Sequence, residues 1–207
     1  MSDAALAPGV WGVVATPFHG PDLQLDRASL ARLARHFDHT GATGLTVLGV
    51  FGEAAQLSAD ERRTVLATVV DAVDLPLVVG TTAVGTAPLL DELALVREAT
   101  GARLAAAMVQ VNSPRADVLR RHLTAVHDAT GLAVVVQDYP VASGVRIGTD
   151  ELGAALTGLP FVAAVKAESP PTTVAVAALT RLLDVPVSAG SAAWGCSTNS
   201  RPDPPAR

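Results

Sequence analysis

Lys166 is the residue whose type and position most directly suggest chemistry, because it is the only lysine in the chain. Lys and Arg together number 15, so every other permanent positive charge is an arginine. An apolar run, residues 161–165, comes directly before Lys166 and is typical of a buried strand. A desolvated lysine can lose its proton and attack a carbonyl carbon, which an arginine does not do. The residue type therefore makes Lys166 a candidate Schiff-base nucleophile. The alternative is that Lys166 has a structural role, in an ion pair with Glu168.

Strands and helices are expected to alternate along the chain. The expected strands are residues 10–15, 44–49, 76–80, 103–111, 132–137, 161–166 and 185–188. The expected helices are residues 26–40, 58–70, 88–99, 114–129, 149–156 and 169–183, with Asp26, Ser58 and Ser113 as N-caps. The strands are continuous apolar runs, which indicates a parallel sheet with helices on its faces.

The order of the elements fits either a doubly wound sheet or a (β/α)8 barrel. The segment after the first strand, residues 15–18, is not the Gly-rich phosphate loop that the doubly wound fold would favour. The expected strands end in residues of a polar or catalytic type: Thr16, Glu53, Thr81, Asn112, Asp138 and Lys166. Active sites of barrels lie at this end of the strands. The sequence therefore predicts an α/β fold, a (β/α)8 TIM barrel, with its site there.

Composition limits the class of protein. The chain has 207 residues, of which 49% are hydrophobic and 3% aromatic, and a formal net charge of −5. The acidic balance and the few aromatic residues argue against binding to nucleic acid. No apolar run approaches the ~18 residues of a membrane span, and no signal peptide is recognisable. A single cysteine, Cys196, excludes an internal disulfide and a cysteine metal cluster, so we expect a cytoplasmic protein without a metal site.

Short motifs follow several of the expected strands: Ala15-Thr16-Pro17-Phe18, Gly49-Val50-Phe51-Gly52-Glu53, Asn112-Ser113-Pro114, Pro140 with Ser143-Gly144, and Lys166. In their order and spacing, these motifs together resemble the dihydrodipicolinate synthase and N-acetylneuraminate lyase family. Members are barrels and commonly homotetramers. The resemblance implies that Lys166 holds pyruvate or another 2-oxo acid as an imine, without a further cofactor, for aldol cleavage, condensation or dehydration.

The same resemblance suggests where the substrate binds. Its carboxylate is expected on backbone N–H groups of Phe51, Gly52 and Glu53, where a turn enters a helix. Turn geometry alone also accounts for the glycines of this loop. Ser143 and Gly144 are expected to line the substrate site. The side chains of Val79, Val136 and Val165 are expected to surround Lys166.

This sequence departs from the family at the groups that assist the lysine. Val50, Val111 and Gln137 stand where the family has the hydroxyl groups of a proton relay, and Ala142 stands where the synthases have an arginine for the second substrate. Tyr139 follows Gln137 by two residues, so it points to the same side if the strand continues.

The departures make Tyr139 a candidate phenol for the site, and packing of its ring with the hydroxyl in water is the alternative. Gln137 is expected to orient the substrate. Asp138 and Glu168 are possible acid–base groups, although solvation or helix capping is the expected role of both. The pattern indicates a divergent subgroup acting on sugar acids or related 2-oxo acids.

The last residues depart from the barrel pattern. Only six βα units and a seventh strand are recognisable, whereas the fold typically needs ~250 residues. We therefore expect a partial barrel over residues 1–190 and an aberrant, disordered tail over residues 191–207, which a frameshift would explain. The leading hypothesis is a Schiff-base lyase. The alternatives are an inactive or unstable barrel fragment and a 2-oxo acid binder without turnover.

Overall fold

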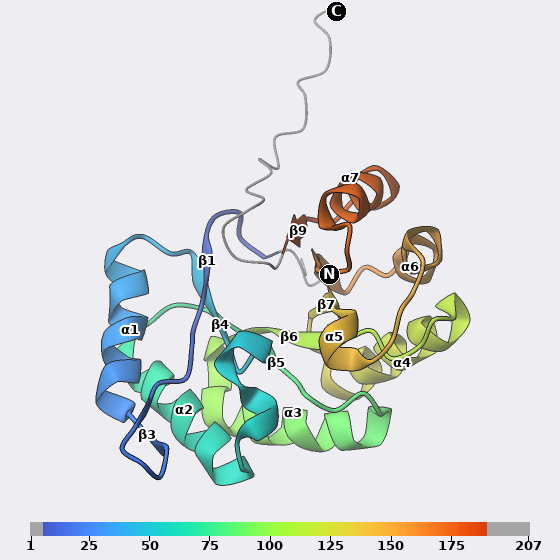
Figure 1. Cartoon of the computed structure of the whole chain (residues 1–207). Helices are drawn as coiled ribbons and strands as arrows, with labels where there is room; N and C mark the ends of the chain where they lie inside the picture. The colour runs from blue at the N-terminus through green and yellow to red at the C-terminus, as the bar shows by residue number, and fades with distance from the viewer. Residues whose placement is uncertain (1–5, 190–207) are drawn as a thin grey trace, which may run out of the picture.

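The computed structural model describes residues 6–189, which form a curved parallel sheet with helices on its outer side (Figure 1). The sheet has seven strands in the order β1-β4-β5-β6-β7-β8-β9. Their bounds are β1 (Trp11–Val13), β4 (Gly44–Val47), β5 (Leu77–Gly80), β6 (Leu104–Gln110), β7 (Val134–Asp138), β8 (Val162–Ala167) and β9 (Val187–Ala189). A short hairpin, β2 (Phe18–His19) and β3 (Gln24–Leu25), follows β1.

The helices follow one another around the outside of this arc. They are α1 (Arg27–His39), α2 (Ala59–Ala72), α3 (Thr86–Thr100), α4 (Ala116–Thr130), α5 (Pro140–Ser143), α6 (Thr149–Leu156) and α7 (Thr172–Leu182). Short 3-10 turns add η1 (Val50–Gly52), η2 (Ala54–Gln56) and η3 (Gly101–Arg103). The alternation of parallel strands and outer helices confirms the predicted barrel architecture in incomplete form, with β1 and β9 at the edges of the described sheet.

The N-caps explain why two of the helices begin where they do. Asp26 accepts a hydrogen bond from the Ser29 N–H at 2.9 Å, and Ser58 forms a capping box with Glu61, as predicted. The prediction for Ser113 is wrong. Helix α4 begins at Ala116 with Arg115 as its N-cap, and the Ser113 hydroxyl accepts the Arg115 N–H instead.

The two faces of the sheet have different surroundings. Outward side chains join the helices in two large apolar clusters, whereas a small cluster with Val78, Ala106, Met108 and Val135 at its centre lies on the inner face. In β8 the outward Val165 and Ala167 are buried, while the inward Ala164 and Lys166 are partly exposed. The inner face therefore carries fewer apolar residues and has access to solvent near Lys166.

Trp11 fills part of the inner space beside the first edge strand. Its ring lies against Gly44, where a Cβ atom would meet ring carbon atoms at 2.3 Å. The glycine of β4 is therefore what allows the indole to lie flat across its neighbour strand. The indole N–H donates to the carbonyl of Ala7 at 3.1 Å, which ties the N-terminal segment to β1.

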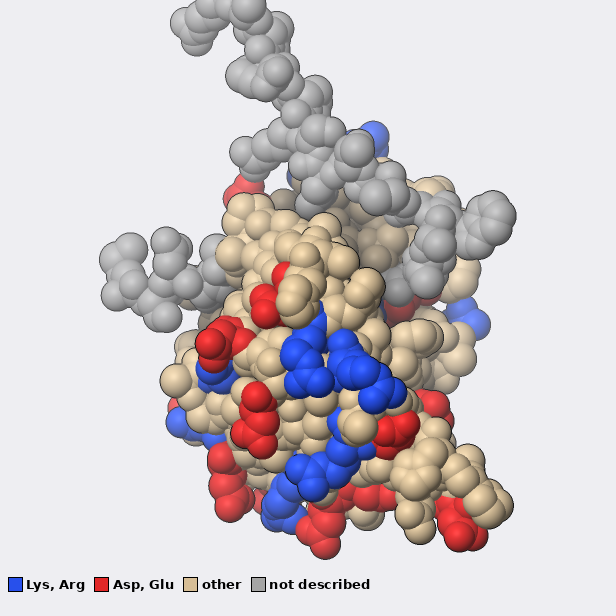
Figure 2. All heavy atoms as spheres, turned by 90° about the vertical axis from the view of Figure 1, so that its left-hand side faces the viewer, with Lys and Arg blue, Asp and Glu red and all other residues tan. Residues whose placement is uncertain are grey.

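The outer surface over α1 and α2 carries interspersed basic and acidic side chains (Figure 2). A shallow hollow between these helices is lined by Arg27, Arg35 and Asp71 among others. It lies outside the arc, away from Lys166. None of the helices in the described part of the chain is long and apolar enough to cross a membrane.

The predicted tail, residues 191–207, lies outside the described residues. The predicted domain boundary at residue 190, the disorder and the frameshift therefore stay predictions.

Candidate active site

Lys166 lies on the inner face of β8, near the carboxyl end of the strand. Its register partners are Gln137 on β7 and Ser188 on β9, and Gln137 in turn pairs with Gln110 on β6. Register partners in adjacent strands point to the same face, so these four side chains form one layer across the inner face. The Lys166 side chain is 13% exposed. It is therefore shielded from bulk water without being sealed from it.

Glu168 is the charged neighbour of Lys166. It follows the lysine by two residues, and its Oε2 lies 3.5 Å from Nζ. Gln137 donates from Nε2 to the same oxygen at 2.6 Å. The Glu168 side chain is only 9% exposed, so the predicted surface role is wrong. The predicted capping role is wrong as well, because α7 begins at a Pro171 N-cap without a side-chain cap. The ion pair that was the structural alternative for Lys166 is present, and Glu168 borders the layer that holds the lysine.

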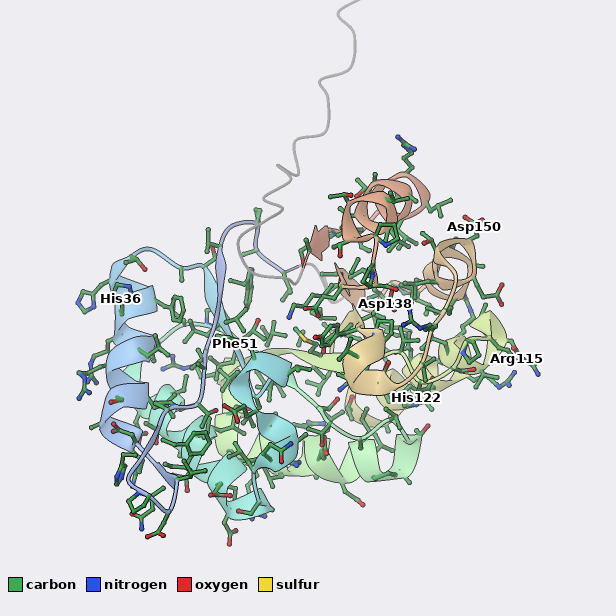
Figure 3. The ribbon with its side chains drawn as sticks, viewed as in Figure 1. His36, Phe51, Arg115, His122, Asp138 and Asp150 are labelled. Atoms are coloured by element: carbon green, nitrogen blue, oxygen red, sulfur yellow. The ribbon has the colours of Figure 1, made fainter. Side chains whose placement is uncertain are left out.

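Asp138 is a second buried carboxyl beside this cluster. It is 3% exposed, and its Oδ1 has no hydrogen-bond partner among the described residues. Burial, and then the negative charge of Glu168, raise the pKa of the Asp138 carboxyl to about 6. The Asp138 carbonyl accepts the Glu168 N–H at 2.9 Å. In Figure 3 the residue lies inside the arc of α4, α6 and α7, so its predicted surface position is wrong.

The predicted valine surroundings of Lys166 are also wrong. Val136 and Val165 belong to one outer apolar cluster and Val79 to the other. Alternation along the strands explains the difference, because Val136 and Val165 each lie one residue before a member of the inner layer. Polar and charged groups, chiefly Gln137 and Glu168, are the neighbours of the lysine instead.

Tyr139 lies where the chain leaves the sheet. Strand β7 ends at Asp138, and Tyr139 is the N-cap of α5, with Pro140 as the first helical residue. The strand therefore does not continue to Tyr139, which was the condition for Tyr139 to point to the same side as Gln137. The Tyr139 carbonyl accepts from Ala142 and Ser143, and the phenol makes no hydrogen bond with a described residue. A catalytic role for Tyr139 stays a prediction.

Ser143 and Gly144 complete this turn. The Ser143 hydroxyl lies 3.3 Å from the Tyr139 carbonyl and accepts the Val145 N–H at 3.2 Å. Gly144 caps α5 at a φ of 71°, a left-handed conformation that favours glycine. Both residues thus have a local structural role, and their contact with a substrate stays a prediction.

The loop after β4 has the expected tight turn. Glu53 adopts a φ of 56°, and Thr16 donates to the Gly52 carbonyl at 2.6 Å, which fixes the loop to the end of β1. The N–H groups of Gly52 and Glu53 donate within the turn, to Gly49 and Val50. The Phe51 N–H makes no backbone bond with a described residue, and Phe51 as a whole is 65% exposed. Of the three predicted anion donors, Phe51 thus has the N–H that the turn does not use, and its binding of a substrate stays a prediction.

No hydroxyl stands at the three expected relay positions. Val50 is exposed on η1, and Val111 is buried in the outer cluster. Beside Lys166, the inner layer has the hydroxyl of Ser188 and the amides of Gln137 and Gln110, and the buried Oε1 of Gln110 has no partner among the described residues. Gln110 was not identified as a site residue from the sequence, although its position near the end of an expected strand could have indicated one. Among the described residues, no group of three or more His, Cys, Asp or Glu side chains could hold a metal ion.

Comparisons with known proteins agree with this architecture. The model of the dihydrodipicolinate synthetase family matches residues 7–183. The 4-hydroxy-tetrahydrodipicolinate synthase of Methanothrix thermoacetophila is 31% identical over 164 residues, which cover 78% of this chain and 54% of that protein. The enzyme of the same name from Haloarcula marismortui is 33% identical over 162 residues, covering 78% and 52%.

Solved structures extend the comparison. The structure described as PhdJ bound to substrate intermediate has a TM-score of 0.75 and 28% identity, and the match covers 86% of this chain and 58% of that one. The chain thus spans about half the length of the curated relatives that it matches. The family match over most of the chain, together with the barrel strands and the inward lysine, shows that this protein belongs to the dihydrodipicolinate synthetase family.

Proposed function

We propose that the protein is a Schiff-base-forming lyase that acts on pyruvate or another 2-oxo acid through Lys166. The observation that carries the proposal is the position of the only lysine, on the inner face of a family barrel and near the carboxyl end of β8. Active sites of such barrels lie at this end of the strands. The partial exposure of Lys166 supports access for a small substrate.

The chemistry follows from the properties of an amine. Neutral Lys166 adds to the 2-oxo carbon of the substrate, and loss of water gives a protonated imine. The positive imine nitrogen withdraws electrons from the adjacent carbon, so that carbon can lose a proton or a bonded aldehyde carbon. Aldol cleavage, condensation and dehydration all use this intermediate, which forms on the protein and needs no separate cofactor.

The specific activity of the curated relatives is not what we propose. Those proteins are named 4-hydroxy-tetrahydrodipicolinate synthase. Here Val50, Val111 and Gln137 replace the hydroxyl groups that the family resemblance places beside the lysine, and Ala142 replaces an arginine. We propose a divergent lyase that carries out a different reaction on pyruvate or another 2-oxo acid, in a homo-oligomer as is common in this family.

Reduction with borohydride tests the proposal. The protein is incubated with pyruvate or with a larger 2-oxo acid, reduced, and analysed by mass spectrometry, with Lys166→Arg as the control. We expect a reduced adduct on Lys166 and consumption of at least one 2-oxo acid. An adduct without turnover of any 2-oxo acid would support the binder. Aggregated protein without an adduct would support the inactive fragment.

A further inference from the structure

One carboxyl group of the described residues lies next to Lys166, at the border of the inner layer. Glu168 is the carboxyl group within 4 Å of Lys166 Nζ among the described residues. Gln137 contacts the same carboxyl but its amide does not titrate. Asp138 has no such contact and lies on the opposite side of its strand from Gln137. Within residues 6–189, Glu168 is therefore the direct partner for proton transfer to and from the lysine.

The geometry of this pair differs from that of a structural ion pair. Charge-assisted N–H···O bonds are typically about 2.7–2.9 Å long, whereas Nζ and Oε2 are 3.5 Å apart. Ion pairs that are this buried add little net stability, because desolvation of both charges offsets their attraction. Gln137 meanwhile holds the carboxyl through a bond of 2.6 Å. The carboxyl is thus held by the amide, whereas Lys166 Nζ makes no hydrogen bond with a described residue.

We infer that Glu168 is the acid–base group of this site, taking the proton that Lys166 must lose before it attacks and returning it to the hydroxyl that leaves as the imine forms. The inference rests on the proposed function. In this scheme a carboxyl group transfers the protons, because the positions where the family has relay hydroxyl groups hold Val50, Val111 and Gln137 here. A group within reach of the reacting nitrogen is what general acid–base catalysis requires.

Protons and charges balance in the proposed steps. Transfer of one proton from the Lys166 ammonium to the Glu168 carboxylate gives a neutral amine and a neutral acid. The amine adds to the 2-oxo carbon, and a proton moves from nitrogen to oxygen, which gives a neutral carbinolamine. Glu168 then protonates the carbinolamine hydroxyl, the C–O bond breaks, and water leaves. The products are a protonated imine on Lys166 and the Glu168 carboxylate, so the pair begins and ends with no net charge.

The carboxylate is then placed for the next step. It can accept the proton from the carbon adjacent to the imine, which gives an enamine and the neutral acid. The same acid can return that proton, or transfer it to the oxygen of an aldehyde in a condensation. Gln137 is a positioning residue in this scheme, because it acts on the substrate through Glu168.

The test follows the rate of imine formation rather than turnover alone. Glu168→Gln removes the titrating proton but keeps the shape of the side chain. Borohydride is added at timed intervals after pyruvate, and the reduced Lys166 adduct is quantified. We expect roughly a 100-fold or larger fall in the rate, within the usual range for loss of an acid–base group. Glu98→Gln, the same change at an exposed position on α3, is the matched control and should leave the rate unchanged.

Two further measurements separate catalysis from folding. Glu168→Asp retains a carboxyl and should recover part of the rate, and added formate should accelerate Glu168→Ala in proportion to its concentration. An unaltered rate in Glu168→Gln would overturn the role of Glu168 and leave the proposed function intact. A loss that neither Glu168→Asp nor formate relieves would also overturn it. Absence of any adduct in the unaltered protein would overturn both proposals.

Discussion

Replacement of Asp138 by asparagine tests how the buried carboxyl affects the free energy of unfolding, and the direction of the pKa shift predicts the sign of that effect. The pKa of this group is raised from 3.8 to about 6, by burial and then by the charge of Glu168. The folded state thus binds more protons than the unfolded state between about pH 4 and pH 6. The free energy of unfolding therefore falls as the pH rises through this window. Above the pKa of the folded state the carboxyl is charged, and the full cost of burying that charge then lowers the free energy of unfolding.

The size of the effect follows from the shift. Each pKa unit corresponds to about 1.36 kcal/mol, so a shift of about two units gives an upper limit of about 3 kcal/mol. The asparagine side chain cannot ionise, so the variant avoids this cost. We expect Asp138→Asn to raise the free energy of unfolding by about 1–3 kcal/mol at pH 7 and to have little effect at pH 4.

Urea denaturation of both proteins at pH 4, 5, 6 and 7 measures this difference. Asp91→Asn, the same change at an exposed position on α3, is the control for a general loss of negative charge and should show no such pH dependence. A difference between Asp138→Asn and the unaltered protein that stays constant with pH would refute the reasoning. So would an Asp138→Asn variant that is less stable at pH 7 than at pH 4 relative to the unaltered chain.

Three further predictions concern positioning and stability. Gln137→Leu removes the amide that holds Glu168, so we expect imine formation to slow by roughly 10- to 100-fold in the timed borohydride assay. An unchanged rate would show that the amide does not position the carboxyl. Gly80→Ala places a Cβ atom 2.3 Å from the Leu48 carbonyl oxygen, so we expect it to lower the free energy of unfolding by about 1–3 kcal/mol in urea denaturation. Gly148→Ala is the control, because its Cβ atom meets no atom within 4 Å and its free energy of unfolding should be nearly unchanged. Ser58→Ala removes the capping box of α2 and should cost about 1 kcal/mol by thermal or urea unfolding, and a neutral result would mean that the cap adds nothing.

The sequence predicted the barrel because local signals and the overall pattern agree. Continuous apolar runs mark strands that are buried on both sides, and the Asp26 and Ser58 caps lie where the periodicity begins. The lone lysine was also found from residue type, since no neighbouring contact is needed to recognise it.

The surroundings of the lysine could not be predicted in the same way. Which side chains of neighbouring strands meet depends on strand register, and the pairing of β7 with β8 shifts between Val134 and Val135. The valines expected around Lys166 face the helices because successive side chains of a strand alternate between its two faces, and Glu168 takes their place. The burial of Asp138 depends on long-range packing for which charge patterns in the sequence give no signal. Pro140 was the local signal for the turn that ends β7, because proline is favoured as the first residue of a helix and Tyr139 is the N-cap before it.

The most direct test of Lys166 as the Schiff-base nucleophile is the position of the reduced adduct in the whole chain. Trypsin cleaves after unmodified Lys166 but not after a reduced adduct, so the modified product is the single peptide of residues 147–181. We predict that incubation with pyruvate or another 2-oxo acid and borohydride produces this peptide with the mass of the added acid. Lys166→Arg should produce no adduct. Complete cleavage after Lys166 with every 2-oxo acid, in protein that remains folded, would contradict the central claim.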